Sequence, residues 1–161
     1  MYDLQKISEE CIKKIKDIGI PVQDDKIVEI KFARTNAQGR CLLTTKGEYY
    51  IKISPLYDDE KIDICELEST VIHELLHTCP DCINHSAKWM EYAKKVRNVY
   101  GYDIFSHKTT YDLRHRDKPV LHRMKCPQCI GYWDVKEQRA WKMIQAGEKC
   151  YCGLCRFEYV L

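Results

Sequence analysis

Residues 73–77 read His73-Glu74-Leu75-Leu76-His77, an HExxH sequence inside a stretch whose apolar spacing predicts a helix over about residues 62–78. Two histidines four residues apart lie on one face of an α-helix, so both imidazoles can reach one metal ion. Glu74 follows the first histidine directly, which places its carboxylate beside that metal without making it a ligand. The combination suits a zinc-bound water and a general base, the chemistry of a metallopeptidase.

His85 is the candidate for a third ligand. It stands four residues before Trp89 and shares the apolar face of a second predicted helix, at the start of that helix. Two helices joined by a short connection pack side by side, so His85 can turn toward His73 and His77. A catalytic zinc takes three protein ligands and keeps one position for water, and three histidines fill that count. Glu91 is the alternative third ligand, although it lies off the Trp89 face.

The C-terminal segment predicts a second metal site. Its four cysteines form two CxxC pairs: Cys126, Cys129, Cys152 and Cys155. Four thiolates in two such pairs make a closed tetrahedral site for structural zinc. The long interval between the pairs contains a capping-box pattern at Asp134 and Glu137, which predicts a short helix there. Cys150 is an alternative to Cys152, but it lacks the knuckle spacing.

A third CxxC pair, Cys79 and Cys82, lies between the two helices that carry the histidines. It could form a reversible disulfide, place a thiolate near the catalytic zinc, or consist of two half-buried cysteines without a role. The sequence leaves these alternatives open.

The composition fits one globular domain with a small module. The chain has 161 residues, of which 45% are hydrophobic and 31% charged, enough for a packed core and a polar surface. A net charge of +2 is too small to argue for nucleic acid by itself. No apolar run approaches the ~18 residues of a membrane span, and the N-terminus lacks the pattern of a secretory signal. We therefore expect a cytoplasmic protein without membrane contact, whose ten cysteines favour metal binding over disulfides.

The remaining pattern predicts an α+β core. An amphipathic first helix precedes three short strands, and a tight turn at Lys46-Gly47 joins the last two strands. Two helices follow, so we expect a three-stranded antiparallel sheet with two helices that carry the site. The predicted domains are a core (1–105), a basic linker (106–120) and a zinc ribbon (121–161).

The linker and the start of the ribbon carry a basic strip: Lys108, Arg114, Arg116, Lys118, Arg123 and Lys125. The strip could face phosphate or an acidic partner, or it could be a solvated linker with Asp112 and Asp117 among its charges. We expect weak DNA binding without base preference if it does face phosphate. Tyr111, Arg114 and His115 are candidates for a second oxyanion donor, because they are polar and follow the core.

Three stretches together resemble the SprT-like zinc metallopeptidases, a family that includes Spartan-type proteases acting at DNA. They are Arg34–Cys41, His73–His77 with His85 and Trp89, and the terminal CxxC pairs, and the resemblance covers nearly the whole chain. It implies that His73, His77 and His85 bind catalytic zinc and that Glu74 is the catalytic acid/base. It also implies a zincin-like core followed by a zinc ribbon, and cleavage of protein substrates. The family usually has a glycine after the third histidine, where this chain has Ser86.

Two other functions stay open on the sequence. One is a nucleic-acid-associated zinc protein whose peptidase site is weak or idle, although such a site could lose Glu74, which is present. The other is an adaptor in which both metals only stabilise the fold.

Overall fold

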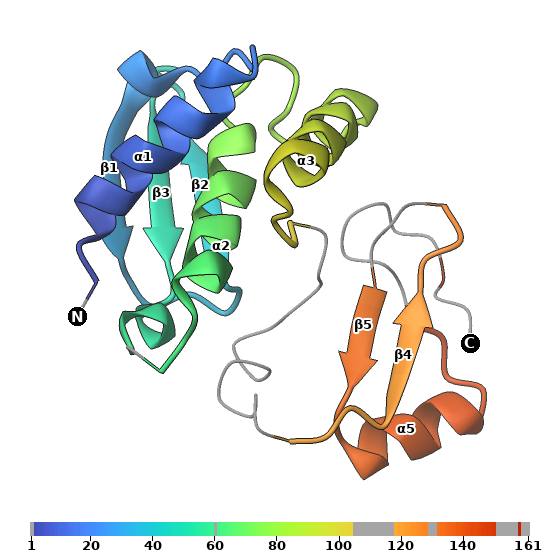
Figure 1. Ribbon diagram of the computed structural model, residues 1–161. Coiled ribbons are helices and arrows are strands. Elements are labelled where there is room, and N and C mark those ends of the chain that lie inside the picture. The colour runs from blue at the N-terminus through green and yellow to red at the C-terminus, as the bar shows by residue number, and fades with distance from the viewer. Residues whose placement is uncertain (1, 60, 105–117, 129–131, 151–157, 159–161) are drawn as a thin grey trace. The chain divides into compact units, whose positions relative to one another are not determined.

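The chain divides into two compact units, Met1–Ile104 and Phe105–Leu161. A computed structural model describes residues 2–59, 61–104, 118–128, 132–150 and 158 (Figure 1). The predicted linker therefore lies almost entirely outside the described residues. Within the described part of the chain, no helix is long and apolar enough to cross a membrane.

The first unit contains a three-stranded sheet in the order β1-β3-β2, formed by Ile27–Phe32, Tyr49–Ile53 and Gly39–Leu43. The predicted hairpin is confirmed: β2 and β3 pair antiparallel, and Gly47 takes a φ of +79° in the turn between them. However, β1 pairs with β3 in parallel. The prediction of a wholly antiparallel sheet is therefore wrong, although the α+β class is confirmed.

The connection between β1 and β2 explains the parallel pair. Ala33 N donates to Ile53 O at 2.9 Å, and Ser54 N donates to Gln38 O at 2.8 Å, so both ends of the connection are bonded to the end of β3. The chain crosses β3 there and enters the sheet again at its opposite edge. Apolar alternation sets the buried face of each strand, but it does not set the strand order or direction.

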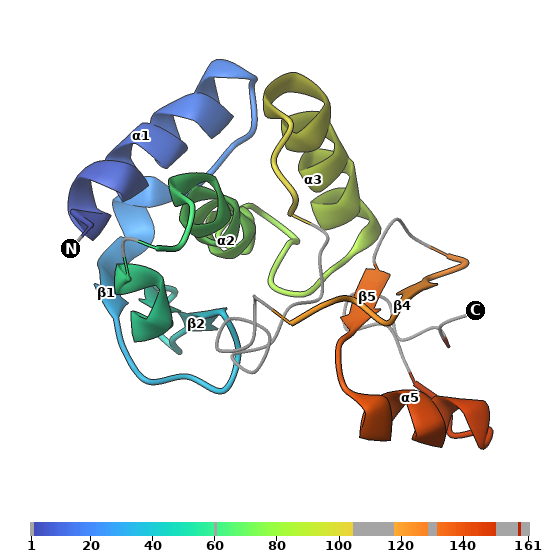
Figure 2. The ribbon, with the colours of Figure 1, turned by 60° about the horizontal axis from the view of Figure 1, so that its bottom comes forward.

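Helices α1 (Leu4–Asp17) and α2 (Ile64–Leu76) lie side by side over one face of the sheet, and α3 (Ala87–Tyr100) packs against α2 (Figures 1 and 2). Two short 3-10 turns, Asp24–Lys26 and Pro55–Asp58, flank the sheet in sequence. Gly101 ends α3 with a φ of +76°, a conformation that favours glycine. The core between helices and sheet is aliphatic, and its fully buried members include Ile51, Ile53, Leu67, Ile72 and Leu75.

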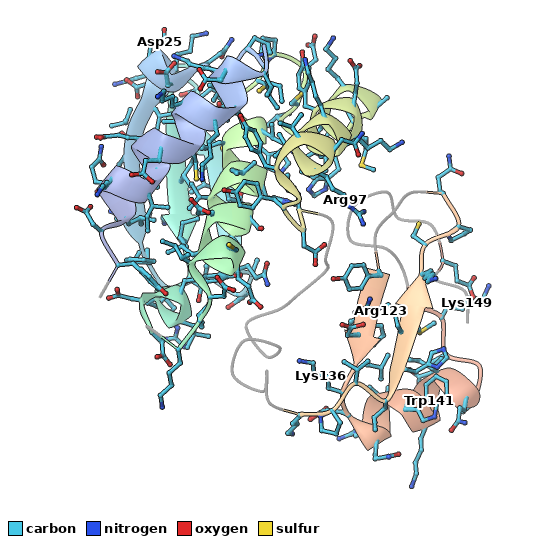
Figure 3. The ribbon with its side chains drawn as sticks, viewed as in Figure 1. Asp25, Arg97, Arg123, Lys136, Trp141 and Lys149 are labelled. Carbon is cyan, nitrogen blue, oxygen red and sulfur yellow. The ribbon has the colours of Figure 1, made fainter. Side chains whose placement is uncertain are left out.

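In the second unit, β4 (His122–Lys125) and β5 (Tyr132–Val135) pair antiparallel, and α5 (Gln138–Gln145) follows. A small core of Met124, Cys126, Val135 and Ile144 is packed by Trp133 and Trp141. Figure 3 shows Arg123 on β4 and Trp141 on α5.

The predicted capping box of α5 is wrong, although its helix is confirmed. Glu137 is the N-cap residue and makes no side-chain capping bond. Asp134 lies in β5 instead, where its Oδ1 is 2.6 Å from Arg123 Nε. The strand therefore extends into the residues that a capping box would need.

Candidate metal centre

Three histidines converge at the end of α2. His73 lies in the last turn of α2, His77 is its C-cap residue, and His85 lies just before α3. Their ring nitrogens all lie within 4.8 Å of one another, and His85 Nε2 is 3.0 Å from His73 Nε2. Tetrahedral zinc with bonds of about 2.0–2.1 Å places its nitrogen ligands roughly 3.3 Å apart. The cluster could therefore hold a metal ion.

Backbone carbonyls orient two of the imidazoles. His77 Nδ1 lies 2.8 Å from Cys82 O, and His73 Nδ1 lies 3.2 Å from Ile104 O. A proton on Nδ1 can be donated to each carbonyl, which leaves the Nε2 lone pair for a metal. Burial lowers the pKa of His77, although the bond to Cys82 acts in the opposite direction. His77 is therefore neutral near neutral pH, which is the form that binds metal.

Trp89 packs against all three imidazoles. It is fully buried, and its ring centroid lies 4.8 Å from that of His73, 5.5 Å from that of His77 and 4.5 Å from that of His85. These contacts restrict the rotation of the three rings. The sequence pairs Trp89 with His85 through their shared helix face, but it does not reveal the contacts with α2.

Ser86 caps α3, because its Oγ accepts from Trp89 N at 3.2 Å and donates to Asp81 O at 2.8 Å. Its φ of −64° is one that any residue adopts, so the backbone needs no glycine after His85.

Glu74 is buried with 6% of its surface exposed, and it lies against β2. A Cβ built on Gly39 would lie only 2.7 Å from Glu74 Cγ and Oε1. Burial raises the pKa of Glu74 to about 8, although a hydrogen bond from the Cys41 backbone and the charge of Arg40 act to lower it. Burial therefore favours the protonated form of Glu74 in the metal-free protein, whereas a bound cation would favour the ionised form.

The other candidates near the site have different surroundings. Glu91, the alternative third ligand, is exposed and is not part of the histidine cluster. Cys79 and Cys82 are buried free thiols, and Cys82 N donates to Cys79 O at 3.1 Å across a turn in which Asp81 has a φ of +62°. The Cys82 backbone contributes to the site through its carbonyl oxygen, which lies 2.8 Å from His77 Nδ1.

The structure describes part of the second predicted site. Cys126 is 7% exposed in the core of the second unit, and Cys150 packs against that core. The other predicted ligands, Cys129, Cys152 and Cys155, lie outside the described residues, as do the oxyanion candidates Tyr111, Arg114 and His115.

The basic strip is described only at its C-terminal end. Arg123 makes two bonds to Asp134, at 2.6 and 2.8 Å, and lies 4.2 Å from the centroid of the Tyr132 ring. Its charge is therefore partly neutralised within its own hairpin. Lys118 and Lys125 are exposed, while Lys108, Arg114 and Arg116 lie outside the described residues.

Comparisons with known proteins leave the site to be interpreted from its own residues. No protein-family model matches the chain, and neither a curated protein nor a solved structure matches it.

Proposed function

We propose that this protein is a zinc-dependent metallopeptidase of the SprT-like type, in which a zincin-like core precedes a zinc ribbon. Its reaction is the hydrolysis of peptide bonds in protein substrates. The observation that carries the proposal is the convergence of three histidine ring nitrogens beside the helical turn that holds a buried Glu74.

The donor set fits zinc. Three imidazoles, two of them with Nδ1 at a carbonyl oxygen, present nitrogen donors and leave a fourth position for water. A zinc ion bound there would supply an activated water and a positive charge for the scissile carbonyl oxygen.

Glu74 carries out the proton transfers in this proposal. It takes a proton from the attacking water and passes it to the leaving amine. A zinc ion at the histidines would favour the ionised form of Glu74, against the desolvation that raises its pKa, so the carboxylate could act as the base. Contact with β2 at Gly39 restricts the position of the side chain.

We also propose a structural zinc on Cys126, Cys129, Cys152 and Cys155. The support is the spacing of the two CxxC pairs, together with the burial of Cys126 in the core of the second unit. A metal bound there would add folding energy to a module whose apolar core is small.

The test combines zinc content with hydrolysis of a denatured, fluorescently labelled protein. The wild type should hold two zinc ions and cleave the substrate. His73→Ala should lose one zinc and all cleavage, Cys126→Ser should lose or weaken only the other zinc, and Glu91→Ala should behave as wild type.

A wild-type chain that holds fewer than two zinc ions would contradict the two-site assignment. A fully loaded chain without cleavage would favour the adaptor alternative. Binding of a hydroxamate to the cobalt-substituted protein then decides between an enzyme and an adaptor, because only a metal with an open coordination position accepts that ligand.

A further inference from the structure

Gly39 begins β2, and it occupies a position where any other residue would collide with Glu74. A Cβ there would lie 2.7 Å from Cγ and Oε1 of Glu74 and 3.0 Å from Cδ, closer than real Cβ atoms approach. The φ of Gly39 is not among the positive values that favour glycine. The backbone conformation therefore does not require glycine at this position, but the space taken by Glu74 does.

The hydrogen-bond register of β2 directs backbone donors away from β3. Strand β2 lies at the edge of its sheet, and Gln38 and Thr44 bond toward the β3 side of the hairpin at 2.8 and 2.9 Å. Antiparallel bonding alternates along a strand, so the N–H groups of Gly39 and Cys41 point away from β3, toward the outer edge of the sheet. The Cys41 backbone acts from there to lower the pKa of Glu74, against the larger effect of burial.

We infer that Gly39 is a positioning residue for Glu74. Its missing side chain lets the carboxylate lie against β2, with Oε1 next to the Gly39 backbone. A carboxylate has two oxygens, so contact of one oxygen with β2 still leaves the other to exchange a proton. The consequence for hydrolysis rests on the proposed function, whereas the contact between Gly39 and Glu74 does not.

The kinetic test uses Gly39→Ala in the zinc-loaded full chain. Displacing Glu74 by about 1 Å should lower kcat about 100-fold, while KM and the zinc content stay within about twofold of wild type. A purely structural role would instead lower zinc content and activity together. Leu43→Ala, at an exposed position on the same strand, is the control and should keep the wild-type kcat.

The second test needs no hydrolysis. Gly39→Ala should lower the melting temperature by about 5 °C or more in the wild-type background, because the added methyl overpacks the site. In a Glu74→Ala background the same change should cost less than about 2 °C, since the colliding side chain is gone. If Gly39→Ala does not fold alone, folding of the double variant supports the inference.

Equal losses in both backgrounds, or a double variant that does not fold, would overturn the inference. A wild-type kcat in Gly39→Ala would do the same. If the wild type itself shows no hydrolysis, the proposed function fails, and the coupling between the two residues still decides the inference.

Discussion

Replacing Glu74 with glutamine separates the three properties of this side chain: shape, charge and proton transfer. Glutamine keeps the shape, and its amide oxygen can still accept from the Cys41 N–H. It does not ionise and does not transfer protons. Glu74→Gln should therefore keep the fold and the zinc and lose roughly 10²- to 10⁴-fold in kcat, the usual contribution of a general acid/base.

The same substitution should change how stability depends on pH. The pKa of Glu74 is raised from 4.5 to about 8, so the folded chain binds this proton more tightly than the unfolded chain. Binding of this proton contributes fully to the stability of the folded chain below pH 4.5, and the contribution is lost as pH rises through 8. At about 1.36 kcal/mol per pKa unit, the metal-free wild type should lose roughly 3–4 kcal/mol relative to Glu74→Gln between pH 5 and 8.

Urea unfolding of both metal-free proteins at several pH values between 5 and 8 measures this loss. The difference between the two curves isolates Glu74, because His77 and the other titrating groups are common to both proteins. A difference that stays constant with pH would refute the burial of an ionisable carboxyl at this position. Loss of zinc from Glu74→Gln would show instead that Glu74 is a ligand.

Three further predictions concern Trp89, the ion pair of Lys14 with Glu68, and the ribbon. Trp89→Phe should weaken metal binding about tenfold in a chelator competition, because the larger indole ring of Trp89 packs against all three imidazoles. An unchanged metal affinity would contradict this prediction. Lys14 Nζ is 2.7 Å from Oε1 of Glu68, whose side chain is 10% exposed. Lys14→Met should therefore lower the free energy of unfolding in urea by about 1–3 kcal/mol. The control Lys13→Met, at an exposed position of the same helix, should lower it by less than about 0.5 kcal/mol. The ribbon should bind DNA weakly and with a steep salt dependence, which fluorescence anisotropy measures. Lys125→Glu should weaken this binding more than Arg123→Glu does, because Arg123 is already paired with Asp134. Equal effects of the two substitutions would contradict the partial neutralisation of Arg123.

The elements that the sequence predicts correctly are those determined by local signals. The period of apolar residues identifies α1, α2 and α3, and the Lys46-Gly47 turn identifies the β2–β3 hairpin. The parallel pairing of β1 with β3 depends on a connection that crosses the end of β3, and no residue pattern within β1 encodes that crossing. The capping box of α5 fails for a related reason, since β-pairing with Arg123 takes Asp134 into a strand.

The candidate site divides in the same way. Helical spacing and a short connection suffice to predict that His85 approaches His73 and His77, because all three lie within 13 residues of one another. The contact of Glu74 with Gly39 joins residues 35 positions apart, and it depends on which edge of the sheet β2 occupies. That edge is set by the same crossing connection, so the position of Glu74 follows from the one topological feature that the sequence pattern does not contain.

The backbone supplies most of the polar groups that orient the site. Cys82 O and Ile104 O lie at hydrogen-bond distance from two of the histidines, and the Cys41 backbone acts to lower the pKa of Glu74. Any residue type supplies the same backbone carbonyl or N–H group, so the side chains at these three positions do not reveal the role of the backbone in a sequence. Gly39 is the exception, because its contribution is the absence of a side chain. The geometry around Glu74 should therefore depend more strongly on residue identity at Gly39 than on the thiol of Cys41.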